Sequence, residues 1–272
     1  MENKTAEKRE NNLFTDPFGN IYFFKRIVVF LLGLLTYRRY NGFNKLKIKG
    51  TEHLKNLPKT NVLFVSNHQT YFADVIAMYH VFNSIKSGYF NSIKNPIYLL
   101  NPKLDFYYVA ATETMKSGIL PKLMSYAGAI TIKRSWRSAG EDVSRGVDVS
   151  GIKDIQKALN SGWVVTFPQG TTKPFAPSRN GVAHMIMELN PIVIPIVIDG
   201  FRRSFDKKGL IVKKTGVCQS MIFKAPLQFN LEKESKEMIL EKVMDSIEQS
   251  EKFIKVMQNT KPKDKIKENN TV

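Results

Sequence analysis

The sequence is poor in cysteine and histidine, and it lacks an apolar run long enough to cross a membrane. Cys218 is the single cysteine among 272 residues, which excludes an intrachain disulfide and a cysteine-rich metal site and is typical of a reducing compartment. The spacing of the four histidines indicates no metal ion either. The uncharged apolar stretch at residues 27–37 falls well short of the ~20 residues that span a bilayer.

Acidic side chains are outnumbered, 24 against 41 basic ones, and the formal net charge of +17 favours an anionic partner. Residues 21–60 carry nine of the basic side chains and one acidic side chain. The same segment contains the apolar stretch 27–37, bracketed by Lys25-Arg26 and Arg38-Arg39. This pattern predicts a helix that lies in the interface of an anionic membrane, with its cations facing the lipid. A buried core helix is the alternative interpretation.

Nucleic acid is the other class of partner that a charge of +17 fits. However, the positive charge flanks an apolar stretch, and the sequence shows no basic recognition helix or zinc pattern. We therefore expect no nucleic-acid partner. We expect instead a peripheral or monotopic protein on the cytoplasmic face of the cell membrane.

Short apolar runs alternate with helical patterns along the chain, which predicts an α/β layered domain with a central, mostly parallel sheet flanked by helices. The expected strands are residues 45–50 (an edge strand), 62–66, 106–111, 128–132, 163–167, 192–197 and 217–223. The expected helices cover residues 71–82, a segment ending near 128, residues 152–159 and a segment from 232 onward. Residues 134–150 are predicted to form a loop, and Pro195 indicates an irregular or edge position.

The domain organisation follows from these patterns. Residues 1–44 form an N-terminal segment with the membrane-associating helix, residues 45–260 form the main domain, and residues 261–272 are a lysine-rich tail predicted to be disordered.

An imidazole and a carboxylate, His68 and Asp74, follow the apolar run 62–66, where a buried strand is expected to lead into a helix. Histidine titrates near neutral pH, and a carboxylate beside it fixes its tautomer and stabilises the imidazolium. The pair therefore suits removal of a proton from a hydroxyl. The alternative is a helix-capping Asp74 and a surface His68 that never meet.

Other polar residues follow the ends of the later strands. Gly170, Thr171 and Lys173 belong to a Pro-x-Gly turn whose backbone N–H groups and cation suit an anion. Arg134 and Arg179 are further cations in corresponding places. Each alone is typical of a solvated surface, but open α/β sheets bind ligands at the carboxyl edge of their strands.

Four ordered blocks of the sequence resemble the glycerolipid acyltransferase family, of which 1-acylglycerol-3-phosphate acyltransferase is typical. The resemblance extends over roughly residues 45–205, and its blocks are Asn67-His68 with Asp74, the segment 128–134, the segment 167–171 and the segment 194–197. It implies His68 and Asp74 as catalytic residues, and Arg134, Gly170, Thr171, Lys173 and Arg179 as substrate-binding residues.

The implied activity is acyl transfer to 1-acyl-sn-glycerol-3-phosphate, which forms phosphatidic acid in phospholipid biosynthesis. The co-substrate is acyl-CoA or acyl carrier protein, with no further cofactor, and the partners are a membrane lipid substrate and an anionic membrane surface. Alternatives are O-acylation of another lyso-lipid, such as a lyso-aminolipid, or a non-catalytic membrane-binding protein.

Three features depart from the family pattern. Five residues separate His68 from Asp74, one more than usual, so the two side chains meet only if His68 lies in the loop before the helix or the first helical turn bulges. Gln169 replaces a glutamate. Thr172 replaces an arginine, which removes a bidentate phosphate clamp.

Overall fold

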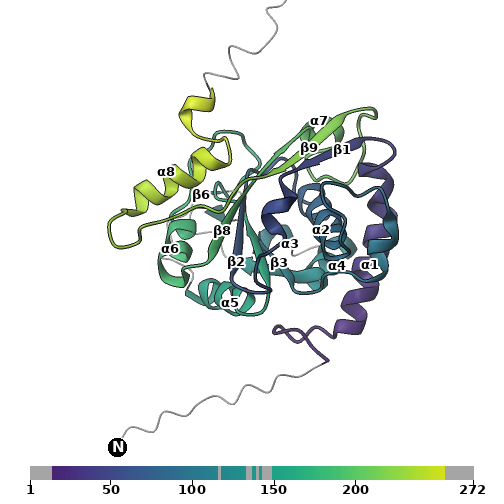
Figure 1. The fold of residues 1–272 in the computed structure, drawn as a ribbon, viewed down its shortest axis with the longest axis horizontal. Helices are drawn as coiled ribbons and strands as arrows, with labels where there is room; N and C mark the ends of the chain where they lie inside the picture. Colours follow the sequence, from purple (N-terminus) through teal and green to yellow (C-terminus); the bar gives the residue numbers. More distant parts are fainter. Residues whose placement is uncertain (1–13, 116–117, 133–136, 139–140, 143–148, 255–272) are drawn as a thin grey trace, which may run out of the picture.

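A seven-stranded sheet with the order β1-β9-β8-β2-β7-β3-β4 forms the centre of the protein (Figure 1). The structure, a computed structural model, describes residues 14–115, 118–132, 137–138, 141–142 and 149–254. The strands of the sheet are β1 (Lys45–Lys49), β2 (Val62–Ser66), β3 (Phe106–Ala111), β4 (Ala129–Ile132), β7 (Trp163–Thr166), β8 (Ile192–Asp199) and β9 (Cys218–Phe223). All neighbours pair in parallel except β8 and β9. The predicted α/β fold with a mostly parallel sheet is confirmed.

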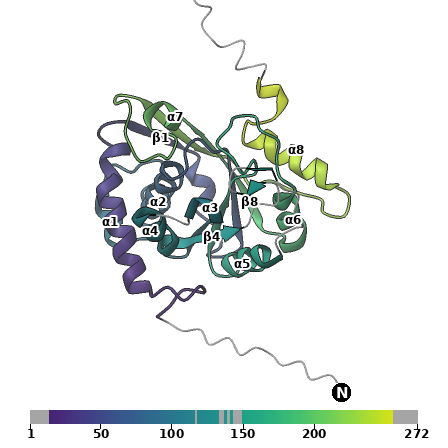
Figure 2. The same ribbon diagram turned by 180° about the vertical axis from the view of Figure 1, so that it is seen from behind.

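Helices cover both faces of the sheet (Figures 1 and 2). One face carries α1 (Tyr22–Tyr40), α2 (Ala73–Lys86), α4 (Ile119–Gly128) and the 3-10 helix η2 (Pro96–Leu100). The other face carries α5 (Val149–Leu159), α6 (Asn180–Leu189) and α8 (Lys236–Ser246). The remaining elements are η1 (Thr51–Leu54), α3 (Thr112–Met115), α7 (Phe201–Ser204) and a pair of two-residue strands, β5 (Arg137–Ser138) and β6 (Glu141–Asp142), inside the segment expected to be a loop.

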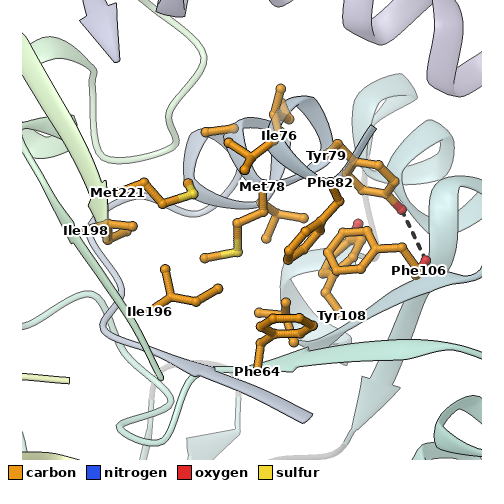
Figure 3. Packing of buried hydrophobic residues seen from close by; sticks show 14 of the residues in the cluster. Phe64, Ile76, Met78, Tyr79, Phe82, Phe106, Tyr108, Ile196, Ile198 and Met221 are labelled. Carbon is orange, nitrogen blue, oxygen red and sulfur yellow. Dashed lines mark hydrogen bonds between the residues drawn. The ribbon is translucent and has the colours of Figure 1, made fainter. Parts of the chain in front are cut away.

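Side chains of β2 alternate between two hydrophobic cores, one on each face of the sheet. Phe64 packs against Phe82 of α2 with their ring centroids 4.8 Å apart, whereas Leu63 faces the core beneath α5, α6 and α8. Helix α2 lies across this first core. The Tyr79 hydroxyl donates to the carbonyl oxygen of Ala127, and the carbonyl oxygen of Phe106 lies 3.5 Å from the same hydroxyl (Figure 3). Nearly every residue of α2 is buried, so the helix is held firmly by its packing. The side chains of its first turn, which include Asp74, therefore have fixed positions.

Helix α1 is amphipathic rather than uniformly buried. Val29 and Tyr40 belong to the core beneath α1, whereas a stripe on the opposite face stays exposed. Among the described residues, no helix has both the length and the apolar character needed to cross a membrane. Lys25 does not face lipid as predicted, because its ammonium is fully buried and forms an ion pair with Asp16 at 2.9 Å.

Pro195 was predicted to mark an irregular or an edge position, and it lies inside the sheet, so the edge alternative is wrong. It pairs in register with Val65 of β2, and β8 itself lies between β2 and β9. The pairing with β9 runs only from Asp199 back to Ile196, so Pro195 sits where the β9 ladder ends. Proline has no backbone N–H, but Pro195 lies just beyond the residues that pair with β9, so no hydrogen bond of that ladder is lost. The predicted tail at residues 261–272 lies outside the described residues.

Candidate active site

The side chains of His68 and Asp74 meet at the carboxyl edge of the sheet. Strand β2 ends at Ser66 and α2 begins at Ala73, so His68 lies in the connecting loop and Asp74 in the first turn of the helix. His68 Nδ1 lies 2.8 Å from Asp74 Oδ2. The loop conformation removes the angular divergence that six positions along a regular helix would impose.

Asp74 is held in place by the whole loop. Its carboxylate is fully buried, and Oδ2 accepts hydrogen bonds from the backbone N–H groups of Gln69 at 2.6 Å and Thr70 at 3.0 Å. Oδ1 accepts a hydrogen bond from the Thr70 hydroxyl at 2.7 Å. Both oxygens accept hydrogen bonds from the loop, and we place the proton of His68 on Nδ1, from which it donates to Oδ2. Nε2 is then the nitrogen that can take up a proton.

The imidazole is both accessible and fixed. The His68 side chain is 13% exposed, which leaves it open to a substrate at the surface. Its ring stacks on Phe167, which follows β7, with centroids 3.9 Å apart and an angle of 24° between the planes. The stacking brings together the two sequence blocks that contain His68 and Gly170.

Asn67 fastens the loop to the neighbouring strand. Its side-chain amide donates to the carbonyl oxygen of Ile198 at 2.8 Å, and its side-chain oxygen accepts from the N–H of Ile198 at 2.8 Å. The side chain thus continues the pairing of β2 with β8 beyond the end of β2. This fixes the position of the loop that carries His68.

The residues predicted to bind substrate follow β7 and begin α6. The N–H of Gly170 donates to the carbonyl oxygen of Phe167 at 2.9 Å, and a φ of +62° closes this tight turn. The N–H of Arg179, at the start of α6, donates to the carbonyl oxygen of Pro168 at 2.8 Å. Thr171 is half-buried and Lys173 is exposed beyond it. Arg134 lies outside the described residues.

The side chain of Gln169 is bonded to other residues of the protein. It is buried, and its amide donates to the carbonyl oxygen of Ala176 at 3.0 Å and to the side-chain oxygen of Gln249 at 3.3 Å. The Gln249 oxygen also accepts from the N–H of Phe175 at 3.0 Å. Two acceptors face the amide of Gln169, so an uncharged donor suits this position better than a carboxylate.

Two residues of the site were not identified from the sequence, Gln69 and Arg202. The Gln69 side chain accepts from the backbone N–H of Arg202 at 3.1 Å and donates to Asp199 Oδ1 at 3.3 Å. The Arg202 guanidinium donates to the carbonyl oxygen of Thr172. Strand β8 extends to Asp199, two residues beyond the predicted end, and Arg202 follows it. Arg202 is therefore another cation at the carboxyl edge of the sheet, where open α/β sheets bind ligands.

Asp199 is ionised beside these residues. Burial alone raises the pKa of the Asp199 carboxyl, but hydrogen bonds from Arg203, Gly200 and Gln69 outweigh burial and hold that pKa below its usual value. Its carboxylate forms an ion pair with Arg203 at 2.8 Å.

Comparison with known proteins gives a family and a fold. The model of a protein family described as Acyltransferase matches residues 45–199, more than half of the chain. A solved structure, the 1-acyl-sn-glycerophosphate (LPA) acyltransferase PlsC from Thermotoga maritima, is similar over 88% of this chain and 83% of its own, with a TM-score of 0.52 and 16% identity. Because only 16% of the residues are identical, this similarity shows the fold alone. No curated protein matches the sequence.

Proposed function

The chain belongs to the Acyltransferase family, and from this premise we propose that it transfers an acyl chain to the free hydroxyl of 1-acyl-sn-glycerol-3-phosphate and forms phosphatidic acid for phospholipid biosynthesis. The acyl donor is acyl-CoA or acyl carrier protein. The observation that carries the proposal is the contact of 2.8 Å between His68 and the buried carboxylate of Asp74. PlsC, a 1-acyl-sn-glycerophosphate acyltransferase, shares this fold, which supports the choice of acceptor.

The chemistry follows from the tautomer of His68. Nε2 removes the proton of the acceptor hydroxyl while the oxygen attacks the thioester carbonyl. The tetrahedral intermediate then collapses, the carbon–sulfur bond breaks, and the imidazolium returns the proton to the departing thiolate. Asp74 stabilises the imidazolium between these two events. The acyl group passes directly from thioester to alcohol.

The turn after β7 supplies the polar groups that the reaction needs. This turn begins at Phe167, on which the His68 ring stacks. The N–H of Gly170 closes the turn by bonding to the carbonyl oxygen of Phe167, so the N–H of Thr171 is the backbone donor that we assign to the reaction. Lys173 and Arg179 are the described cations that we assign to the same edge, where they favour an anionic acceptor. Donors fixed in this way stabilise negative charge as it develops, without reorganisation.

We also propose that α1 holds the protein on the cytoplasmic face of an anionic membrane. Leu31, Leu34 and Leu35 are 48%, 56% and 74% exposed and lie on one face of the helix. The neighbouring elements add Ile97, Leu100 and Ile119, which are also exposed. An apolar face of this kind, with Arg38 exposed at its end, fits a helix lying in the lipid interface.

An acyl-transfer assay tests the proposed activity. Purified protein is given labelled acyl-CoA or acyl carrier protein and a panel of lyso-acceptors, and the lipid products are separated. We expect phosphatidic acid from lysophosphatidic acid, near-complete loss of product with His68→Ala, and normal turnover with His53→Ala, which changes an exposed histidine. Product from a lyso-aminolipid alone would identify the alternative acceptor. Turnover retained by His68→Ala would contradict the mechanism.

Liposome flotation tests the membrane surface. Leu35→Glu introduces a charge into the exposed apolar face, whereas Met238→Glu introduces the same charge on α8, on the other side of the sheet. We expect Leu35→Glu to lower binding to vesicles that contain anionic lipid and Met238→Glu to leave it unchanged. Equal binding by the two variants would exclude α1 as the docking surface.

A further inference from the structure

We propose that Arg202 binds the anionic headgroup of the acceptor and so determines its class. This inference rests on the proposed function and deepens it, because it assigns headgroup recognition to a residue outside the four sequence blocks. The Arg202 guanidinium takes the role of the family's arginine, which Thr172 replaces in this sequence.

The position of Arg202 supports this role. Its backbone N–H bonds to Gln69, the residue after His68, and its guanidinium bonds to the carbonyl oxygen of Thr172, in the turn after β7. Arg202 therefore joins the loop of the general base to the turn that presents the backbone donors. The side chain is exposed, so the remaining N–H groups of the guanidinium are open to a ligand at this edge.

The charge of Arg202 is available, unlike that of its neighbour. Arg203 is neutralised by Asp199, with Nη1 and Nη2 bonded to the two carboxylate oxygens at 3.2 and 2.8 Å. Within the described part of the chain, no carboxylate forms an ion pair with Arg202, whose guanidinium contacts a neutral carbonyl instead. A cation held by a neutral partner keeps its full attraction for an incoming anion.

The chemistry of the ligand follows from the guanidinium. A planar fork of N–H donors matches the oxygens of a phosphate, which a lysine ammonium binds only as a point charge. The Arg202 guanidinium extends from α7 and is bonded to the backbone carbonyl of Thr172, next to the position where the family has its arginine. The acceptor class is therefore a lyso-lipid with a phosphate monoester headgroup.

A pair of acceptors tests the proposal. Lysophosphatidic acid and the neutral monoacylglycerol share an acyl chain and a glycerol hydroxyl and differ in the phosphate. We expect Arg202→Gln to raise KM for lysophosphatidic acid about 10- to 100-fold, with little change in the turnover of monoacylglycerol. Arg202→Lys keeps the charge and loses the fork, so its KM should lie between. Lys214→Gln, the matched control, removes an exposed cation outside the site and should keep the wild-type KM for both acceptors.

A swap separates headgroup binding from a structural role. If Arg202 only joins two loops, Thr172→Arg combined with Arg202→Thr loses that contact and stays impaired. If the fork is what matters, the double variant regains tight use of lysophosphatidic acid, because the guanidinium returns to the same place from position 172.

Equilibrium dialysis with a short-chain radiolabelled lysophosphatidic acid gives a readout that does not require turnover. Weaker binding by Arg202→Gln than by Lys214→Gln supports the assignment even if no acyl donor is accepted, a result that would count against the proposed function alone. Equal binding and equal KM for these two variants would overturn the role of Arg202 and leave the proposed function intact.

Discussion

His68 Nδ1 and Asp74 Oδ2 lie 2.8 Å apart although the two residues are six positions apart and belong to different elements. The contact exists because the loop between β2 and α2 wraps around the carboxylate, so that its own N–H groups and the imidazole converge on one buried group. The first turn of α2 places the carboxylate, and the loop places the base.

Replacing Asp74 by Asn should remove most of the activity. Four donors from His68, Gln69 and Thr70 converge on the two oxygens of Asp74, and an amide offers only one oxygen to them. The imidazole then loses the acceptor that fixes its tautomer, and we expect kcat to fall about 10³- to 10⁴-fold. Steady-state kinetics measure this change, and thermal unfolding shows whether the variant is folded at the assay temperature. Asp105→Asn removes a carboxylate at the opposite edge of the sheet and should keep wild-type kcat.

Gly209 supports the same loop from outside. Its φ is +79°, and a Cβ there would lie 2.6 Å from the backbone nitrogen of Ala73 and 2.9 Å from Thr70 Oγ1, the hydroxyl bonded to Asp74. Gly209→Ala should therefore displace the loop and lower kcat, since a misplacement of about 1 Å costs about 10²-fold. Gly216 has a φ of +71° and open space around it. Gly216→Ala imposes similar backbone strain without the clash, so its kcat should stay close to wild type; equal kcat losses would contradict the role of Gly209.

Much of the fold follows from local patterns in the sequence. Parallel strands buried on both faces must be apolar throughout, and the runs at residues 62–66 and 163–166 mark β2 and β7 for that reason. The partner of Lys25 does not follow from local pattern, because Asp16 lies in a separate N-terminal turn and only folding brings the two together. A basic residue beside an apolar stretch looks the same in sequence whether it meets lipid or a buried carboxylate.

The site, like the fold, was predictable only where it depends on local sequence patterns. A strand followed by a helix indicated where His68 and Asp74 would lie, but the conformation of a loop with one extra residue depends on its tertiary contacts. The loop pairs with a distant segment, as the N–H groups of Tyr71 and Phe72 donate to the carbonyl oxygens of Lys207 and Lys208. Arg202 comes from that same part of the chain, so both features depend on contacts between residues far apart in sequence.

Restoring the family's glutamate at position 169 should destabilise the protein. The amide of Gln169 is buried and donates to two oxygens, those of Ala176 and Gln249, which a carboxylate would face without a proton. We expect Gln169→Glu to lower the free energy of unfolding at pH 7 by about 1–3 kcal/mol, as for a buried group left unsatisfied. Burial raises the pKa of such a carboxyl, so the loss should shrink as the pH falls and the group regains a donor. Urea unfolding at pH 7 and pH 5 measures both effects, and Gln156→Glu on the exposed face of α5 should show neither.

His80 makes the protein sensitive to acid through burial. It joins three elements, with Nε2 2.9 Å from the hydroxyl of Thr36 and Nδ1 2.8 Å from that of Tyr98. Burial lowers the pKa of His80 from 6.5 to about 3, so between these values the unfolded chain binds a proton that the folded chain does not. Stability from this group is complete above pH 6.5 and is lost as the pH falls toward 3, by up to about 1.4 kcal/mol per pH unit.

Comparison of two histidine variants isolates this contribution. His80→Gln keeps hydrogen-bonding groups and removes the titration, so its unfolding free energy should be lower than wild type at pH 7 and should fall less between pH 7 and pH 5. His53→Gln removes an exposed histidine and should follow the wild-type pH profile. If His80→Gln and wild type lose equal stability over this interval, the acid sensitivity arises from another group, because no other change separates the two proteins.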